Sequence, residues 1–270
     1  MHYQMWIWSK FENVIAHFLI AMMEELIILY YVLFYMFLLM YYHYNNIISY
    51  KEVAYMGKIK LLHGSDHIIE KPDLLLGKTN NDYGRGFYCT QELSMAMEWA
   101  CKKNSDGFVN KYVLEQDSLN ILNLLDGKYN ILHWMALLLK NRTFRLSNEI
   151  AIDACDYIIE NFSIDLKAYD VIIGYRADDS YFSFAESFVQ NGLPLRSLNE
   201  ALHLGRLGTQ TVLISEKSFR NLTFDGADFA DKTVYYPKFI ARDSNVRETY
   251  RREIRNRHSY KNDIFVLDIL

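Results

Sequence analysis

The stretch DYGRGFYCT, residues 82–90, places two glycines around one arginine and follows them at once with two aromatic residues. Glycines at this spacing indicate a tight turn of the backbone or the close approach of another group. The aromatic residues Phe87 and Tyr88 are typical of a strand, in which successive side chains point to opposite faces. We therefore expect a loop followed by a short strand that buries one ring and presents the other.

The composition indicates a chain that can form a hydrophobic core. Of its 270 residues, 51% are hydrophobic and 23% are charged, which argues against a mainly disordered protein and allows one domain with extensions or two small ones. The net charge of −4 gives no general reason to expect nucleic-acid binding. The 3 cysteines form no zinc-binding spacing, so we expect free thiols, a reducing compartment and no metal site.

Residues 1–55 differ in character from the rest of the chain. The stretch LIILYYVLFYMFLLMYY, residues 26–42, has no charged residue, and a transmembrane helix needs roughly 20 apolar residues. Glu24 and Glu25 precede this run, whereas Lys51, Lys58 and Lys60 follow it, so the positive-inside rule would keep the carboxyl-terminal part in the cytoplasm. One hypothesis is therefore a hydrophobic N-terminal helix that contacts the membrane through residues 26–42 and anchors a cytoplasmic domain to the inner membrane.

Two other interpretations of this segment stay open. It could be a buried helix of a soluble protein. It could also be a misplaced start, because Met56 stands just before the first well-patterned segment. In both cases we expect the protein to be cytoplasmic.

The pattern becomes globular from Met56 onward. Alternation and apolar runs predict strands at residues 58–65, 86–90, 109–115, 169–179 and 209–216. Helical periodicity predicts helices at residues 90–103, 131–140, 147–161, 180–192 and 197–208. Thr90 is the expected N-cap of the first helix, and Ser197 with Glu200 forms a capping-box pattern in the last. The irregular alternation of strands and helices favours an α+β fold.

We expect the domain to cover residues 56–225. Residues 226–270 would form a charged C-terminal extension that packs on this domain. Within the extension, residues 242–263 read as a charged helix with a solvated face.

Three segments carry a resemblance to a known family. In order, LLHGS (61–65), DYGRGFYCTQELSMAMEWA (82–100) and LGTQTVLISE (207–216) resemble the core of mono-ADP-ribosyltransferases of the diphtheria-toxin/PARP type, whose motif is His, Tyr and Glu on separate strands. IIEKPD (68–73), DYGRGFYCT, VIIGYRADDSYFSFAESF (171–188) and LGTQTVLISEKSF (207–219) more closely resemble the bacterial DUF3990 family, placed in the same superfamily. The resemblance covers about residues 58–224. It implies split antiparallel β-sheets with helical insertions.

The resemblance also implies roles for individual residues in binding NAD. His63 would donate a hydrogen bond to the adenosine ribose, and Gly64 would hold the nicotinamide carboxamide through its backbone. Ser65 would contact the nicotinamide-side ribose or the amide. Tyr88 would stack on the nicotinamide ring, with Phe87 packed inward.

The loop before Tyr88 would form the rim of this site. Gly84 and Gly86 would let the backbone turn and approach the dinucleotide. Arg85 and Arg176 could meet the pyrophosphate, because the arginine fork suits phosphate oxygens. Taken singly, each of these residues has a simpler explanation as packing, turn or surface charge. Their order in one chain favours the NAD site.

The third motif position departs from the pattern. Gln210 stands where the resembled family places a catalytic Glu, so it offers an amide oxygen but no formal charge. Asp178 and Asp179 could supply a carboxylate, although both could equally cap the following helix. Glu216 shares a side of the strand with Gln210 only if the strand extends that far.

The implied function is that of an NAD-dependent mono-ADP-ribosyltransferase with His63, Tyr88 and Gln210 as its catalytic residues. It would act on a macromolecular acceptor as a bacterial toxin or effector, in which case an antitoxin partner is expected. Two other hypotheses stay open. One is a catalytically weak module that binds NAD or ADP-ribose, and the other is a membrane-tethered interaction protein.

Overall fold

The computed structural model describes residues 34–36, 57–177, 179–204, 208–255 and 262–270. The chain divides into two compact units, residues 1–56 and 57–270. In the first unit only Phe34, Tyr35 and Met36 are described, and they are helical. The membrane segment predicted at residues 26–42 otherwise lies outside the described residues. Among the helices that are described, none combines the length and the apolar character needed to cross a membrane.

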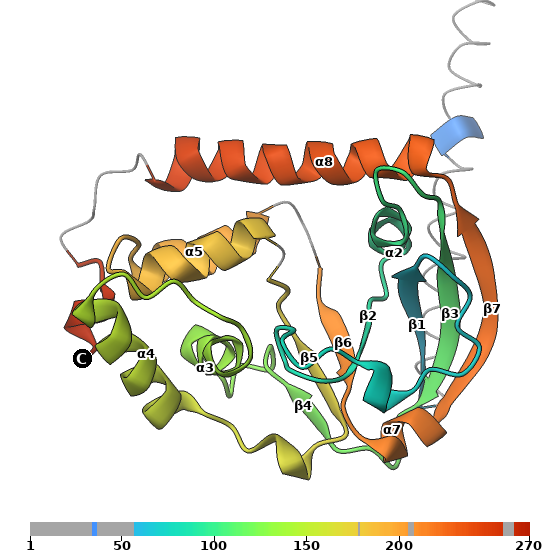
Figure 1. The fold of residues 1–270 in the computed structure, drawn as a ribbon, viewed down its shortest axis with the longest axis horizontal. Helices are drawn as coiled ribbons and strands as arrows, with labels where there is room; N and C mark the ends of the chain where they lie inside the picture. Colours follow the sequence, from blue (N-terminus) through green and yellow to red (C-terminus); the bar gives the residue numbers. More distant parts are fainter. Residues whose placement is uncertain (1–33, 37–56, 178, 205–207, 256–261) are drawn as a thin grey trace, which may run out of the picture. The chain divides into compact units, whose positions relative to one another are not determined.

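The second unit is a mixed α+β fold with two sheets (Figure 1). The first sheet has the order β1–β3–β7 and is antiparallel throughout; its strands are β1 (Lys58–Ser65), β3 (Gly107–Glu115) and β7 (Leu222–Ala230). The second has the order β2–β6–β5–β4, with β2 (Phe87–Cys89), β6 (Gln210–Leu213), β5 (Val171–Gly174) and β4 (Ile121–Asn123). The strand predicted at residues 58–65 is confirmed to the residue.

The expectation of antiparallel sheets is wrong for one pair of strands. β4 and β5 run parallel, with Ile121 opposite Val171. Two helices, α3 (Ile131–Asn141) and α4 (Glu149–Phe162), lie between these strands in the sequence. Such a crossover returns the chain in its original direction, which a tight hairpin cannot do. Two strands were not predicted from the sequence: β4, which is only 3 residues long, and β7.

The predicted helices between residues 90 and 208 are present, with ends shifted by a few residues. Besides α3 and α4 they are α2 (Leu93–Ala100), α5 (Asp179–Val189) and α6 (Leu195–Leu202). Short helical turns lie at Leu74–Leu76, Leu166–Ala168 and Val266–Asp268.

Both predicted helix starts are wrong in detail. Glu92 is the N-cap of α2, while the Thr90 hydroxyl accepts a hydrogen bond from the Glu92 amide at 3.1 Å and so forms a turn before the helix. Ser197 is buried inside α6 and cannot cap it, because the helix begins earlier, directly after Pro194.

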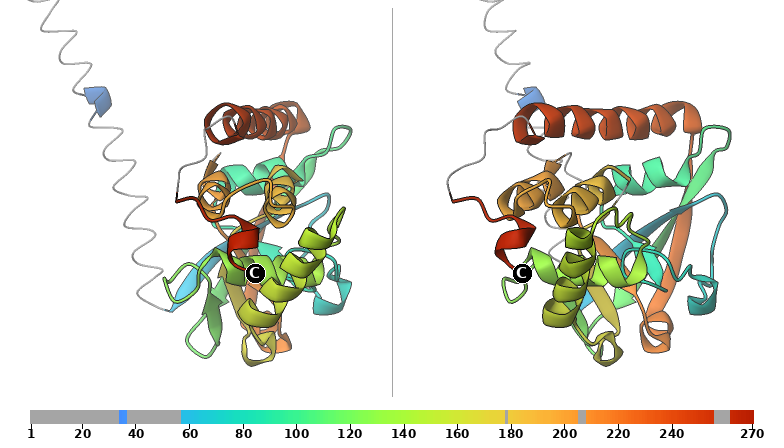
Figure 2. Two further views of the ribbon diagram at one scale, coloured as in Figure 1. Left: turned by 90° about the vertical axis from the view of Figure 1, so that its left-hand side faces the viewer. Right: turned by 60° about the vertical axis from the view of Figure 1, so that its left-hand side comes forward.

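The C-terminal part of the chain continues the fold. Residue 225, the predicted end of the domain, falls inside β7. After β7 comes α8 (Lys232–Thr249), which begins ten residues before the predicted charged helix and continues as a π-helical turn at Tyr250–Arg255. Figures 1 and 2 show α8 lying along α2 and α5. The Nε atom of Arg242 lies 2.8 Å from a carboxylate oxygen of Glu98, which fastens α8 to α2.

The two sheets meet at a short bridge between β1 and the end of β2. The amide of Leu62 donates to the carbonyl of Thr90 at 2.8 Å, and the amide of Thr90 donates back at 2.9 Å. Leu61 and Cys89, which flank this bridge, are fully buried. The bridge therefore sets the carboxyl-terminal half of β1 beside β2.

Helix α2 packs very closely on the first sheet, and glycines make this possible. A Cβ atom on Gly64 would lie 2.2 Å from the carbonyl oxygen of Ala96 and 2.7 Å from the amide nitrogen of Ala100. A Cβ on Gly107 of the neighbouring strand would lie 2.0 Å from the carbonyl oxygen of Ala100. Both clashes involve helix backbone, so they cannot be relieved by moving a side chain.

We predict that Gly64→Ala lowers the free energy of unfolding by about 3 kcal/mol, since α2 must move away from β1. The control is Gly127→Ala, where a Cβ would meet open space but φ is +83°. That substitution should cost only the backbone strain, about 1 kcal/mol. Urea denaturation of the full chain measures both. Equal losses would show that α2 does not pack against Gly64 this closely.

Candidate functional site

A cavity of about 600 Å³ is lined by residues of both sheets, by α2 and by the loop between β1 and β2. This volume lies within the range of about 300–1,000 Å³ that is usual for small-molecule sites. His63 from β1, Tyr88 from β2 and Gln210 from β6 all line it. The structure therefore brings the three predicted motif residues together.

His63 is held by the strand beside it. Its Nδ1 atom lies 2.7 Å from the carbonyl oxygen of Tyr88, and its ring stacks on Phe87 with 4.4 Å between centroids. A carbonyl oxygen can only accept, so Nδ1 carries the hydrogen. Burial lowers the pKa of His63, which favours the neutral ring. In that tautomer the other nitrogen, Nε2, is a hydrogen-bond acceptor.

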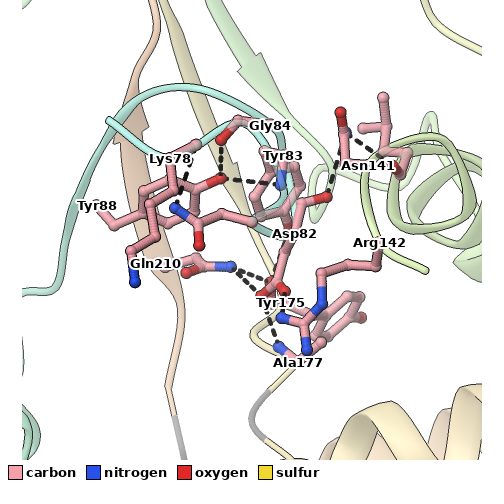
Figure 3. Close-up of polar contacts among 12 residues, drawn as sticks. Lys78, Asp82, Tyr83, Gly84, Tyr88, Asn141, Arg142, Tyr175, Ala177 and Gln210 are labelled. Atoms are coloured by element: carbon pink, nitrogen blue, oxygen red, sulfur yellow. Dashed lines mark hydrogen bonds and ion pairs between the residues drawn. The ribbon is translucent and has the colours of Figure 1, made fainter. Parts of the chain in front are cut away.

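Tyr88 stabilises the glycine loop that precedes it, residues 82–86. Its hydroxyl donates to the carbonyl of Gly84 at 2.7 Å and accepts from the amide of Tyr83 at 3.0 Å (Figure 3). Gly84 has φ of +77°, a left-handed conformation that permits this turn. A Cβ on Gly86 would lie 2.8 Å from the carbonyl oxygen of Leu213, so the second glycine allows the loop to approach β6. The first glycine turns the chain and the second permits close packing.

Phe87 is buried, in line with the expectation that one ring of the pair packs inward. It packs edge-on against Tyr112 at 5.4 Å as well as on His63, while part of its surface lines the cavity. Tyr88 is half-buried and also reaches the cavity. Burial raises the pKa of the Tyr88 hydroxyl, which keeps it protonated.

Gln210 is buried, and two acceptors fix its carboxamide. The Nε2 atom donates to a carboxylate oxygen of Asp82 at 3.2 Å and to the carbonyl of Tyr175 at 3.0 Å. Because both partners can only accept, the NH₂ group must face them. The amide oxygen then lies on the side away from Asp82, as Figure 3 shows. Gln210 also lines the cavity, and its amide oxygen is the atom that these two hydrogen bonds do not use.

Asp82 holds several parts of this site together and was not predicted from the sequence. Its carboxylate accepts from Arg142 Nη1 at 3.0 Å, from the amide of Ala177 at 3.0 Å and from Gln210. It thereby links the glycine loop, the end of α3, the segment after β5, and β6 (Figure 3). An acidic residue directly before a glycine turn was a usable signal. No sequence signal pointed to Arg142, because a basic residue after a helix is common.

Four of the predicted cofactor-binding residues, as the structure describes them, do not line the cavity: Gly64, Ser65, Arg85 and Arg176. Gly64 faces α2, and the Ser65 hydroxyl is bonded to Asn110 and to the carbonyl of His67. Arg85 is exposed, whereas Arg176 is buried with its guanidinium 3.0 Å from the centre of the Trp99 ring. The basic residues that do line the cavity are Lys71, Lys78 and Arg142.

Of the other candidate carboxylates, the structure describes only that of Glu216, which stands apart from Gln210. β6 ends at Leu213, and Glu216 is an exposed residue at the start of α7 (Glu216–Arg220). Asp178 and the side chain of Asp179 lie outside the described part of the chain. Among the described residues, no group of three His, Cys, Asp or Glu side chains could hold a metal ion.

The depressed pKa of His63 predicts a pH dependence of stability. The unfolded chain takes up a proton on this residue as the pH falls below about 6.5, whereas the folded chain resists it. Stability is therefore full above pH 6.5 and declines below it, by up to about 1.4 kcal/mol per pH unit for one proton. In urea denaturation at pH 7.5 and pH 5.5, His63→Gln should remove this part of the decline. His203→Gln, at an exposed histidine, should not; equal effects would contradict the burial of His63.

Comparison with known proteins gives one match. The family model described as "Protein of unknown function (DUF3990)" matches residues 59–224, which include His63, Tyr88, Asp82 and Gln210. No curated protein and no solved structure matches the chain. The matched region begins in β1 and ends in β7, so it spans both sheets and every strand that lines the cavity. The chain belongs to the DUF3990 family.

Proposed function

We propose that the protein is an NAD-dependent mono-ADP-ribosyltransferase that acts on a macromolecular acceptor. One observation carries the proposal. His63, Tyr88 and Gln210 come from three different strands and two sheets, yet they line a single cavity in the order of the transferase motif. Two sheets set side by side through the β1–β2 bridge at Leu62 and Thr90 are compatible with the split-sheet fold that the proposal requires.

The cavity offers a suitable contact for each part of NAD. The half-buried ring of Tyr88 would stack on nicotinamide. The neutral ring of His63 would accept a hydrogen bond from a ribose hydroxyl through Nε2, which reverses the direction expected from the sequence. Lys71 and Lys78 would meet the negative pyrophosphate.

Gln210 would act at the bond that breaks. Transfer breaks the bond between the ribose and nicotinamide, which leaves with the electron pair, and a nucleophilic atom of the acceptor forms the new bond to the ribose. Positive charge develops on the ribose as the bond to nicotinamide lengthens. The amide oxygen of Gln210 would accept from a ribose hydroxyl and turn its negative end toward this charge. A carboxylate would stabilise the charge more strongly, so we expect slow turnover.

The missing formal charge on Gln210 supports a second candidate, a module that binds NAD or ADP-ribose without turnover. Titration of the full chain with NAD tests what both candidates share. Incubation with labelled NAD and a cell lysate separates them, because only a transferase labels an acceptor. Absence of NAD binding would contradict both.

We predict that Tyr88→Ala weakens NAD binding by about 1–2 kcal/mol, because it removes the stacking surface. Tyr88→Phe is the matched control. It keeps the ring and loses the hydroxyl bonds to Gly84 and Tyr83, so it should lower stability by about 1 kcal/mol while affinity stays nearly unchanged. Calorimetric titration measures affinity, and thermal unfolding measures stability. Unchanged affinity in a folded Tyr88→Ala protein would contradict the stacking role.

We predict that Gln210→Ala reduces turnover of NAD by about a hundredfold and leaves the Kd for NAD nearly unchanged, because the contact acts mainly on the transition state. Gln190→Ala is the control, since Gln190 donates a comparable hydrogen bond to the Arg145 carbonyl but does not line the cavity. It should leave both quantities unchanged. A parallel loss of affinity and turnover in Gln210→Ala would assign residue 210 to substrate binding instead.

A further inference from the structure

We propose that Asp82 is a positioning residue whose carboxylate fixes the orientation of the Gln210 carboxamide, so that the amide oxygen faces the cavity. That this oxygen accepts a hydrogen bond from NAD rests on the proposed function. The orientation of the carboxamide rests on its contacts with Asp82 and Tyr175 alone. Asp82 contacts Gln210 and would act on the chemical step only through it.

A glutamine side chain can present either its oxygen or its NH₂ group, and the two have nearly the same shape. At position 210 the reversed orientation would set the amide oxygen about 3 Å from both the Asp82 carboxylate and the Tyr175 carbonyl. The amide oxygen has no hydrogen to donate, so neither acceptor would then have a hydrogen bond from Gln210. The carbonyl of Tyr175 also accepts from the Tyr83 hydroxyl at 2.7 Å, so it stays bonded without Gln210. The charged Asp82 is therefore the partner that decides the orientation.

Asp82 can act in this way because it is itself held. One carboxylate oxygen bonds Arg142 at 3.0 Å, and the other bonds the amide of Ala177 at 3.0 Å. The guanidinium of Arg142 lies 4.7 Å from the centre of the Phe182 ring. With 8% of its surface exposed, Asp82 has little freedom to turn toward water. The charge of Asp82 is paired with that of Arg142. The effect of Asp82 on Gln210 is therefore to fix the direction in which the carboxamide points.

The orientation of the Gln210 carboxamide restricts which ligand group can lie beside it. The atom that Gln210 presents to the cavity is an acceptor, so the ligand group seated there must be a donor such as a ribose hydroxyl. A Glu at position 210 would instead meet the carboxylate of Asp82. A carboxylate at position 210 would therefore require a matching change at Asp82.

The test is a double-mutant cycle on the full chain with Asp82→Asn, Gln210→Glu and the combined variant. Gln210→Glu places two carboxylates in contact and should lower Tm by about 5 °C at pH 8. The loss should shrink at pH 5, where a shared proton relieves the repulsion. In the combined variant the new amide at position 82 can donate to the new carboxylate at position 210, while its oxygen accepts from Arg142 or Ala177. Most of the lost stability should return.

Glu98→Gln is the matched control for Asp82→Asn. Glu98 is equally buried and bonds Arg242 at 2.8 Å, but it does not line the cavity. Both substitutions should lower Tm. Only Asp82→Asn should also lower turnover of NAD, about tenfold, with the Kd for NAD nearly unchanged. Strictly additive Tm shifts in the cycle, or a loss in Gln210→Glu that is the same at pH 5 and pH 8, would overturn the proposal.

A measurement on the unsubstituted chain covers the case in which the variants do not fold. With ¹⁵N-labelled glutamine, the side-chain NH₂ signal of Gln210, assigned with Gln210→Met, should exchange slowly with solvent. Fast exchange would overturn the proposal. Failure to bind or turn over NAD would count against the proposed function alone, because the cycle and the exchange rate still decide the contact. Normal NAD turnover in Asp82→Asn would remove the positioning role and leave the proposed function standing.

Discussion

The pair of hydrogen bonds between Leu62 and Thr90 is the constraint on which the site depends. It joins an edge strand of one sheet to an edge strand of the other and sets β1 beside β2. His63 follows Leu62 directly, so its ring reaches the carbonyl of Tyr88 and stacks on Phe87. The contact of Phe87 with Tyr112 of β3 adds to this connection between the two sheets. The cavity is therefore a product of where the sheets join.

The glycines that flank this region act mainly through packing. Gly64 admits the backbone of α2, and Gly86 admits the backbone of β6. Only Gly84, with its positive φ, is required by the conformation of its own backbone. A glycine next to a candidate ligand-binding residue is easily read as making room for the ligand. Here Gly64 lies beside His63 but makes room for a helix.

The sequence predicted those features that depend on local pattern. The alternation at residues 58–65 marks β1, and the apolar periodicities mark the helices. His63, Tyr88 and Gln210 were found because each lies in a recognisable segment. Asp82 was visible in the opening stretch, but its partners were not. Arg142, Ala177 and Gln210 are distant in sequence, and only the three-dimensional fold shows that they converge on one carboxylate.

The same convergence changes how the Gln at position 210 is understood. From sequence alone, Gln in place of Glu reads as the loss of a charge. In the structure, the carboxylate of Asp82 lies 3.2 Å from the amide nitrogen, and Arg142 already balances its charge. A Glu at position 210 would add a second buried carboxylate against the first, which is unfavourable unless a proton is shared. An amide satisfies Asp82 with its nitrogen and keeps an acceptor toward the cavity. The residue at position 210 is therefore explained by its neighbour, and a Glu there would be accommodated only with a matching change at Asp82.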